Sequence, residues 1–192
     1  MLINLHPETN IPPATGRILI SEPFLADPYF KRTIVLLCEH NKQGSFGFVL
    51  NKFVNLKIED LLEGFPAFKT RISVGGPVQS NNMYYIHTHG DKISGALKIK
   101  DNIYMGGDFD EMQNLVTSGI IDSNDIRFFI GYSGWDEDQL DKELKEKSWF
   151  VTDITSTQIM DTSEKNLWET ILKSMGSDYE LLTQFPEDPS LN

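Results

Sequence analysis

Apolar residues along this chain occur in short runs that are separated by glycine, proline and asparagine. The short apolar run at 16–21, with Pro23 just beyond it, is typical of a strand that stops there. The run at 33–39 is continuous, which is typical of a strand that is buried on both faces. Turn residues at 41–44 separate the second run from another at 46–51, so these two segments are predicted to form a β-hairpin. Further strands are predicted at 71–74, 82–87, 103–105, 126–131 and 149–152.

Helical patterns lie between these strands. Asp108 and Glu111 have the spacing of a capping box, and Asp136 is expected to cap a strongly charged helix. A last helix is expected to stop at Gly176. The strands come in hairpin-like clusters with helices inserted, so the pattern predicts an α+β fold with a mixed or mostly antiparallel sheet. The predicted helices span 58–63, 108–119, 137–147 and 167–175.

No internal repeat and no long linker rich in Pro, Gly or Ser divides the chain. Its 192 residues are therefore predicted to form a single domain. Residues 1–13 are expected to be a flexible surface arm that leads into the first strand. Residues 185–192 are expected to be a proline-rich, acidic tail on the surface.

Charge and composition narrow the possible partners. The chain has 28 acidic side chains against 17 Lys and Arg, a net charge of −11, which opposes direct binding to DNA and to anionic membranes. No apolar run reaches the ~18 residues of a membrane span, and the N-terminal residues lack the pattern of a secretion signal. The single cysteine, Cys38, cannot form an internal disulfide. These features predict a cytoplasmic protein.

Two sets of side chains could carry catalysis. Cys38 and His40 lie on one face of a predicted strand, as a thiol and its base would. The favoured interpretation is that Cys38 is a buried apolar residue, because it ends an apolar strand. His87 and His89 could hold a metal together with His40, but zinc or iron needs three or four ligands, so a solvated histidine pair is favoured. No metal site and no cofactor is predicted.

Glycines mark the ends of several predicted strands. Glycine accepts a positive φ and a close backbone approach, which leaves amide groups free to face a ligand. Trp135 is expected to be exposed beside one of these loops, and Arg32 could add positive charge. We therefore expect the loops to converge on one concave binding surface, although tight turns alone would also explain the glycines. The segments are Gly75-Gly76-Pro77, Gly106-Gly107-Asp108 and Gly131-Tyr132-Ser133-Gly134-Trp135.

Several of these segments together resemble the YqgE/AlgH family. The resemblance covers 16–40, 44–52, 75–78, 131–135 and the ending 185–192, in the family's order and spacing. It implies a bacterial, cytoplasmic protein with a coiled, bifurcated sheet that approaches a barrel, with helices packed outside. It implies no activity, although some members are labelled transcriptional regulators. The family's motif residues match Pro23, Glu39, His40, Gly44, Gly47, Asn51, Gly75, Gly76, Pro77, Gly131, Gly134 and Trp135.

A binding or regulatory module is the function that these observations favour, with an unknown protein or small-molecule partner and an unknown oligomeric state. One alternative is a hydrolase or metal-dependent enzyme that uses His40 with His87 and His89. Another is a transcriptional regulator that acts without direct DNA contact. The expected binding surface comprises Arg32, Glu39, His40, Asn51, Gly75, Gly76, Pro77, Gly131, Gly134 and Trp135.

Overall fold

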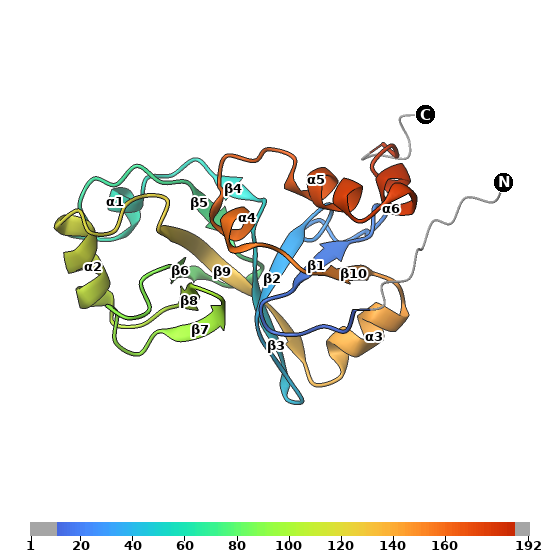
Figure 1. Ribbon diagram of the computed structural model, residues 1–192, viewed down its shortest axis with the longest axis horizontal. Coiled ribbons are helices and arrows are strands. Elements are labelled where there is room, and N and C mark those ends of the chain that lie inside the picture. Colours follow the sequence, from blue (N-terminus) through green and yellow to red (C-terminus); the bar gives the residue numbers. More distant parts are fainter. Residues whose placement is uncertain (1–10, 187–192) are drawn as a thin grey trace.

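The computed structural model describes residues 11–186, which form ten strands and six helices (Figure 1). The strands are β1 (Ile18–Ser21), β2 (Ile34–Asn41), β3 (Gly44–Val49), β4 (Phe53–Val54), β5 (Ile72–Val74), β6 (Val78–His87), β7 (Leu97–Lys100), β8 (Ile103–Met105), β9 (Ile126–Asp136) and β10 (Trp149–Thr152). The helices are α1 (Ile58–Leu61), α2 (Phe109–Thr117), α3 (Gln139–Lys145), α4 (Ser156–Met160), α5 (Leu167–Ser174) and α6 (Ser177–Leu182).

The strands form one branched sheet in the order β10-β1-β2-β3-β9-β6-β8-β7, with β4 and β5 attached beside this path. All pairings are antiparallel except that of β5 with β9. The first half of β9 pairs with β5 and β6, whereas its second half pairs with β3, so the sheet bifurcates at β9. The predicted α+β class and the bifurcated sheet are confirmed. The sheet is not closed into a barrel, because β7 and β10 lie at the two ends of the described strand order and do not pair with each other.

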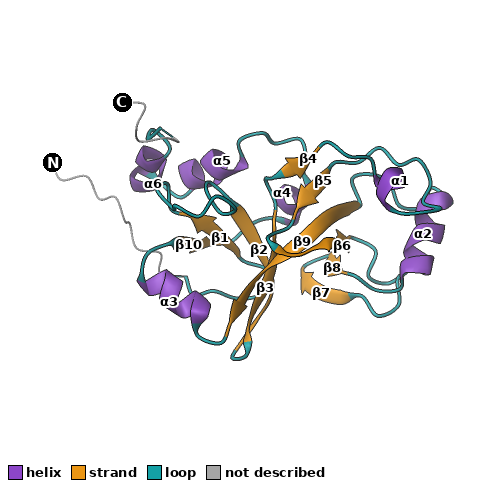
Figure 2. Cartoon of the chain, turned by 180° about the vertical axis from the view of Figure 1, so that it is seen from behind, coloured by secondary structure: helices purple, strands orange, loops and turns teal. Residues whose placement is uncertain are grey.

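The apolar runs in β1 and β2 have cover on both faces. Ile20 belongs to a buried cluster with Trp168 of α5, whereas its neighbour Leu19 belongs to another with Leu140 of α3. Figures 1 and 2 show α5 and α3 on opposite sides of this part of the sheet. Successive side chains of a strand point to opposite faces, so a strand covered on both sides needs apolar residues at almost every position.

A separate cluster fills the other end of the molecule, where α1 and α2 pack against β5, β6 and the first half of β9 (Figure 1). Asp108 caps α2 as predicted, since its side chain accepts a hydrogen bond from the Glu111 backbone at 2.9 Å. The reciprocal half of the capping box is replaced, because the Glu111 carboxylate accepts from Ser94 N at 2.6 Å and Ser94 Oγ at 3.1 Å. That contact ties α2 to the loop before β7.

Two predicted boundaries are wrong for one reason. Residues 132–135 were expected to be a turn, but they continue β9, which reaches Asp136 and pairs there with Gly44. Asp136, which was expected to cap the following helix, is therefore the last residue of β9. That helix, α3, instead begins after Asp138, whose φ is 60° and whose side chain makes no capping bond. Helices α4 and α6 and strands β4 and β7 have no counterpart among the predicted elements.

Most of the predicted terminal segments, residues 1–10 and 187–192, lie outside the described residues. At the inner end of the predicted arm, Ile11 packs against the cluster that contains α3, and Pro12 O accepts a hydrogen bond from Arg17 Nη1 at 2.6 Å. Between residues 11 and 186, no helix is both long enough and apolar enough to cross a membrane.

Candidate functional site

The predicted binding-surface residues lie in separate places along the β2–β3 hairpin. Glu39 and His40 lie near its tip, whereas Arg32 and Asn51 lie at its open end and line a different cavity. The ends of β2, Ile34 and Asn41, are seven residue steps apart at about 3.3 Å each, so the two places are roughly 23 Å apart. The single concave surface expected from the sequence is therefore divided.

The glycines after β5 and within β9 come together, and their role is close backbone packing. A Cβ on Gly75 would lie 2.3 Å from Gly131 O, and one on Gly131 would lie 2.6 Å from Gly76 O. The Gly75 amide donates to Ile130 O at 2.8 Å. Pro77 follows and leads into β6. These glycines let two chain segments touch where side chains would hold them apart.

The third glycine segment, 106–108, contacts the end of β6. The Gly106 amide donates to Tyr85 O at 3.0 Å, and Gly106 O accepts from His87 Nε2 at 2.9 Å. Both backbone groups of Gly106 are thus bonded within the protein.

The hairpin tip is a tight turn held by its own polar groups. Asn41 accepts from Gln43 N at 2.8 Å and donates to Glu39 Oε1 at 2.6 Å. Gly44 has a φ of 141°, and a Cβ there would lie 2.3 Å from Trp135 O. A side chain at position 44 would therefore break the contact between β3 and β9.

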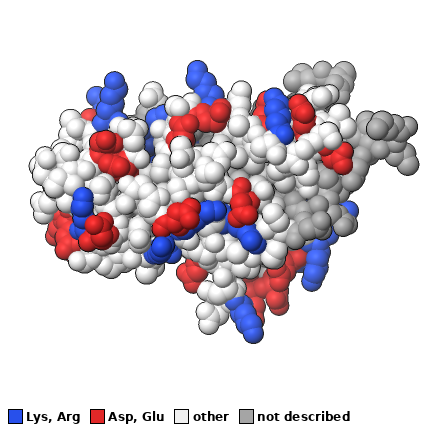
Figure 3. Space-filling model, viewed as in Figure 1, with Lys and Arg blue, Asp and Glu red and all other residues white. Residues whose placement is uncertain are grey.

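Two cavities flank this tip. The first, which we call the aromatic cavity, has a volume of about 460 Å³, and its lining includes Glu39, Phe46, Val78, Tyr132, Gly134 and Asp136. The second, the acidic cavity, has a volume of about 470 Å³, and its lining includes His40, Lys42, Asp136, Glu137, Asp138 and Asp141. Figure 3 shows carboxylates gathered beside the hairpin tip on the side of α3.

Cys38 and His40 do not form a pair. The β2–β3 register shifts between Leu37 and Glu39, and Cys38 packs into the core cluster that contains α5. Burial raises the pKa of the Cys38 thiol and keeps it protonated at neutral pH, as favoured from the sequence. His40 Nδ1 lies instead 2.8 Å from Ser45 Oγ. Ser45 is absent from the predicted site residues, because only the strand register places it opposite His40.

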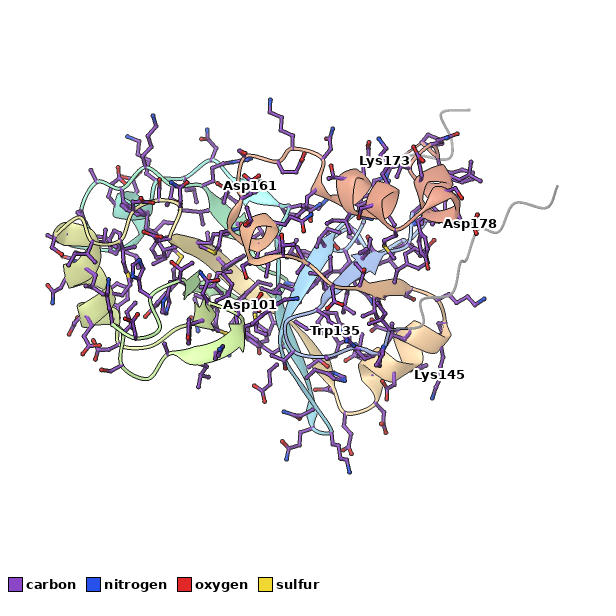
Figure 4. All side chains as sticks on the ribbon, viewed as in Figure 1. Asp101, Trp135, Lys145, Asp161, Lys173 and Asp178 are labelled. Carbon is purple, nitrogen blue, oxygen red and sulfur yellow. The ribbon has the colours of Figure 1, made fainter. Side chains whose placement is uncertain are left out.

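The expectation that Trp135 is exposed is wrong, because only 5% of its surface is accessible to solvent. Its Nε1–H donates to Glu143 Oε2 at 2.9 Å, and Trp149 Nε1–H donates to the same oxygen at 2.8 Å. Figure 4 places Trp135 between β3 and α3. Trp135 is buried because β9 continues through residue 135, which places the indole beneath α3 and not in a loop.

The prediction that His87 and His89 are both solvated is wrong for His87. His87 is fully buried, its Nε2 bonds to Gly106 O, and its Nδ1 accepts from His89 N at 3.2 Å. Burial lowers the pKa of His87, so the ring is neutral at pH 7. His89 Nε2 lies 3.4 Å from Asp125 Oδ2. Within the described part of the chain, no group of three or more His, Cys, Asp or Glu side chains could hold a metal ion.

At the open end of the hairpin, Asn51 connects the two strands through backbone groups. Its Oδ1 accepts from Ile34 N at 2.9 Å and its Nδ2 donates to Arg32 O at 2.8 Å. The Arg32 guanidinium lies over the Trp168 ring, 4.9 Å from the centroid, and donates to Phe185 O. Asn51 thus positions Arg32.

Comparison with known proteins decides the family. A family model described as AlgH-like matches residues 18–180. The chain belongs to this AlgH-like family. The UPF0301 protein of Cytophaga hutchinsonii is 43% identical over 178 residues, which is 92% of this chain and 98% of that protein. The UPF0301 protein of Parabacteroides distasonis is 43% identical over 182 residues, 94% and 92% of the two chains.

Solved structures agree with the fold of this AlgH-like chain. The solution structure of the AlgH protein from Pseudomonas aeruginosa matches with a TM-score of 0.73 and 25% identity, over 93% of this chain and 98% of the other. Protein DIP2367 from Corynebacterium diphtheriae matches with a TM-score of 0.76 and 19% identity, over 92% and 95%, which bears on the fold alone. The family resemblance is confirmed. The names of these relatives state no activity, so function is argued from the cavities.

Proposed function

We propose that this AlgH-like protein is a binding module whose two cavities at the hairpin tip take a positively charged segment of a partner protein. The observation that carries the proposal is the lining of the aromatic cavity. It combines the carboxylates of Glu39 and Asp136 with the rings of Phe46 and Tyr132, and none of its described lining residues is Lys, Arg or His. Carboxylates beside aromatic faces suit a Lys or Arg side chain.

The acidic cavity extends the same preference along α3. Glu137, Asp138 and Asp141 add three carboxylates to that of Asp136, and Lys42 is the one lysine or arginine in the described lining. In a protein of net charge −11, this concentration of negative charge attracts a cationic partner at long range and raises its association rate.

The aromatic rings offer a surface for the apolar stem of a long basic side chain. Phe46 and Tyr132 lie 4.6 Å apart between ring centroids, and Gly134 contributes no side chain above them. Lys and Arg bury their methylene stems along such surfaces while the charged group reaches a carboxylate. The arrangement therefore favours an extended peptide with basic side chains over a free small cation.

The lining is held in place before any partner binds. The Asp136 amide donates to Gln139 Oε1 at 3.0 Å, which joins the end of β9 to α3, and Asn41 holds the Glu39 carboxylate at the tip. A preformed site loses less conformational entropy on binding, so a short peptide can be retained.

Fluorescence polarisation with a short labelled peptide rich in Arg and Lys tests this proposal. We expect saturable binding, and no binding of a same-length peptide with acidic residues in place of the basic ones. The variant E39Q/D136N should weaken binding by at least about tenfold, because each lost charge removes a charge-assisted hydrogen bond. D178N/E180Q, on α6, removes the same charge far from the tip and should bind like the unmodified protein. Equal weakening by both variants would reduce the effect to bulk charge and refute the site.

The thiol and metal alternatives gain no support, because Cys38 is buried and His87 is bonded within the protein. A cytoplasmic location and an indirect regulatory role stay predictions. A gel shift with duplex DNA at about 50 mM salt, where phosphate contacts are strongest, should show no complex.

A further inference from the structure

A small cavity at the open end of the β2–β3 hairpin has the opposite character from the cavities at the tip. Its volume is about 190 Å³, and it lies where the start of β2, the end of β3 and the start of α5 meet. Arg32, Lys52 and Lys165 line it together with Glu169. We infer that this cavity is a phosphate-binding site, for inorganic phosphate or for the terminal phosphoryl group of a larger molecule.

The charge of the lining is the first reason. Three cationic side chains face one carboxylate, in a chain with eleven more acidic than basic residues. The carboxylate of Glu169 is itself offset, since its Oε2 lies 3.5 Å from Lys173 Nζ one turn further along α5. Like charges repel, so three cations around a small cavity are stabilised by an anion between them.

Arg32 is fixed in place with a donor to spare. Its backbone has a φ of 50°, a left-handed conformation that side chains disfavour, and Asn51 holds its carbonyl at 2.8 Å. The guanidinium lies over Trp168, whose Nε1–H is anchored on Ser21 O at 3.0 Å. One terminal nitrogen donates to Phe185 O, while Nε is buried and has no hydrogen-bond partner in the described structure. The contacts with Trp168 and Phe185 thus hold the guanidinium of this lining residue in place.

The start of α5 adds backbone donors to the same cavity. Asn166 occupies the N-cap position, but its side chain makes no capping hydrogen bond. The N-cap side chain thus leaves the amides of the first turn of this eight-residue helix uncapped, and the helix N-terminus carries partial positive charge. Backbone amides beside cationic side chains are a common arrangement for binding phosphate oxygens.

The size of the cavity and the carboxylate of Glu169 indicate which anion can bind there. A cavity of about 190 Å³ has the volume of about six water molecules at ~30 Å³ each, which admits a tetrahedral oxyanion or one phosphoryl group but cannot enclose a whole nucleotide. Phosphate at neutral pH is partly protonated, so Glu169 can accept a hydrogen bond from its hydroxyl. Sulfate has no such proton and would meet the carboxylate as a like charge. The cavity should therefore prefer phosphate to sulfate.

The test is an NMR titration of the full-length ¹⁵N-labelled protein with inorganic phosphate, and in separate arms with sulfate and glycerol 3-phosphate. We expect saturable shifts of the amides of Leu167, Trp168 and Glu169, with sulfate binding more weakly. Glycerol 3-phosphate should bind at least as tightly as inorganic phosphate if the natural ligand is a phosphomonoester, and more weakly if it is free phosphate. Either result supports the site.

Charge variants locate the site. K165Q alters an exposed side chain and should weaken phosphate binding about tenfold, as should K52Q, because each loses a charge-assisted contact. K145Q removes the same charge from α3 at the other side of the sheet and should leave binding unchanged (Figure 4). Absence of saturable shifts at 167–169, equal weakening by K145Q, or equal binding of sulfate and phosphate would each overturn the assignment. None of these results depends on peptide binding at the hairpin tip.

Discussion

Glu143 of α3 is expected to hold the two tryptophans, Trp135 and Trp149, in place beneath that helix. Its Oε2 accepts from Trp135 and Trp149, and its Oε1 accepts from Gln139 Nε2 at 2.9 Å. The two indoles are only 5% and 4% exposed, so both N–H groups depend on this carboxylate as their acceptor within the protein.

The magnitude follows from these two donors. E143A leaves two buried N–H groups unsatisfied at about 1–3 kcal/mol each, and we expect a loss near 3 kcal/mol because water can partly fill the vacated, half-buried position. E143Q keeps one acceptor oxygen but loses the charge, which should cost about 1–2 kcal/mol. A loss of 3 kcal/mol is large against the 5–15 kcal/mol that typically stabilises a domain.

Urea unfolding followed by far-UV circular dichroism measures these differences. E146A, on the same helix, removes an exposed carboxylate paired with Lys142 and should cost under about 0.5 kcal/mol. W149F removes one of the two donors, so E143A should cost less in that background. If E143A is no more damaging than E146A, the carboxylate does not hold the indoles, and the packing account of α3 is refuted.

Three further outcomes are expected. G47A should lower the free energy of unfolding in urea by more than about 2 kcal/mol, because its Cβ would lie 2.2 Å from Leu36 O. G64A is the control: the φ of Gly64 is 76° and no atom lies within 4 Å of the added Cβ, so it should lose only about 1 kcal/mol. Equal losses would contradict this explanation. Burial lowers the pKa of His87, so below the ordinary histidine pKa of 6.5 the unfolded chain binds more protons than the folded one. The free energy of unfolding should therefore fall from pH 7 to pH 5, and H87Q should flatten that slope. The pKa of Asp125 is also lowered, but this carboxyl affects stability only below its ordinary pKa of 3.8. Cys38 should resist thiol reagents in the native protein and react once urea unfolds it, and rapid native labelling would show that the thiol is accessible.

Local sequence patterns were enough to predict most of the longer strands and helices and to indicate the family. Near-continuous apolar runs at 33–39 predicted a strand covered on both faces, and α5 and α3 provide that cover. Asp108 and Gly176 marked helix ends through local chemistry, which needs no knowledge of distant residues. A further local signal at Thr155 and Gln158, a complete capping box, could have revealed α4.

The contacts between segments that are distant in the sequence depend on long-range packing and strand pairing. Pairing with β3 extended β9 through the predicted turn, which buried Trp135 and moved the start of the next helix. The register placed Ser45 against His40, and the packing of α5 brought Lys165 to Arg32 across more than a hundred residues of chain. Local composition fixes turns and caps because those interactions span a few residues. Register and helix docking depend on which distant surfaces bury the most apolar area together, so sequence patterns alone could not predict any of the three cavities.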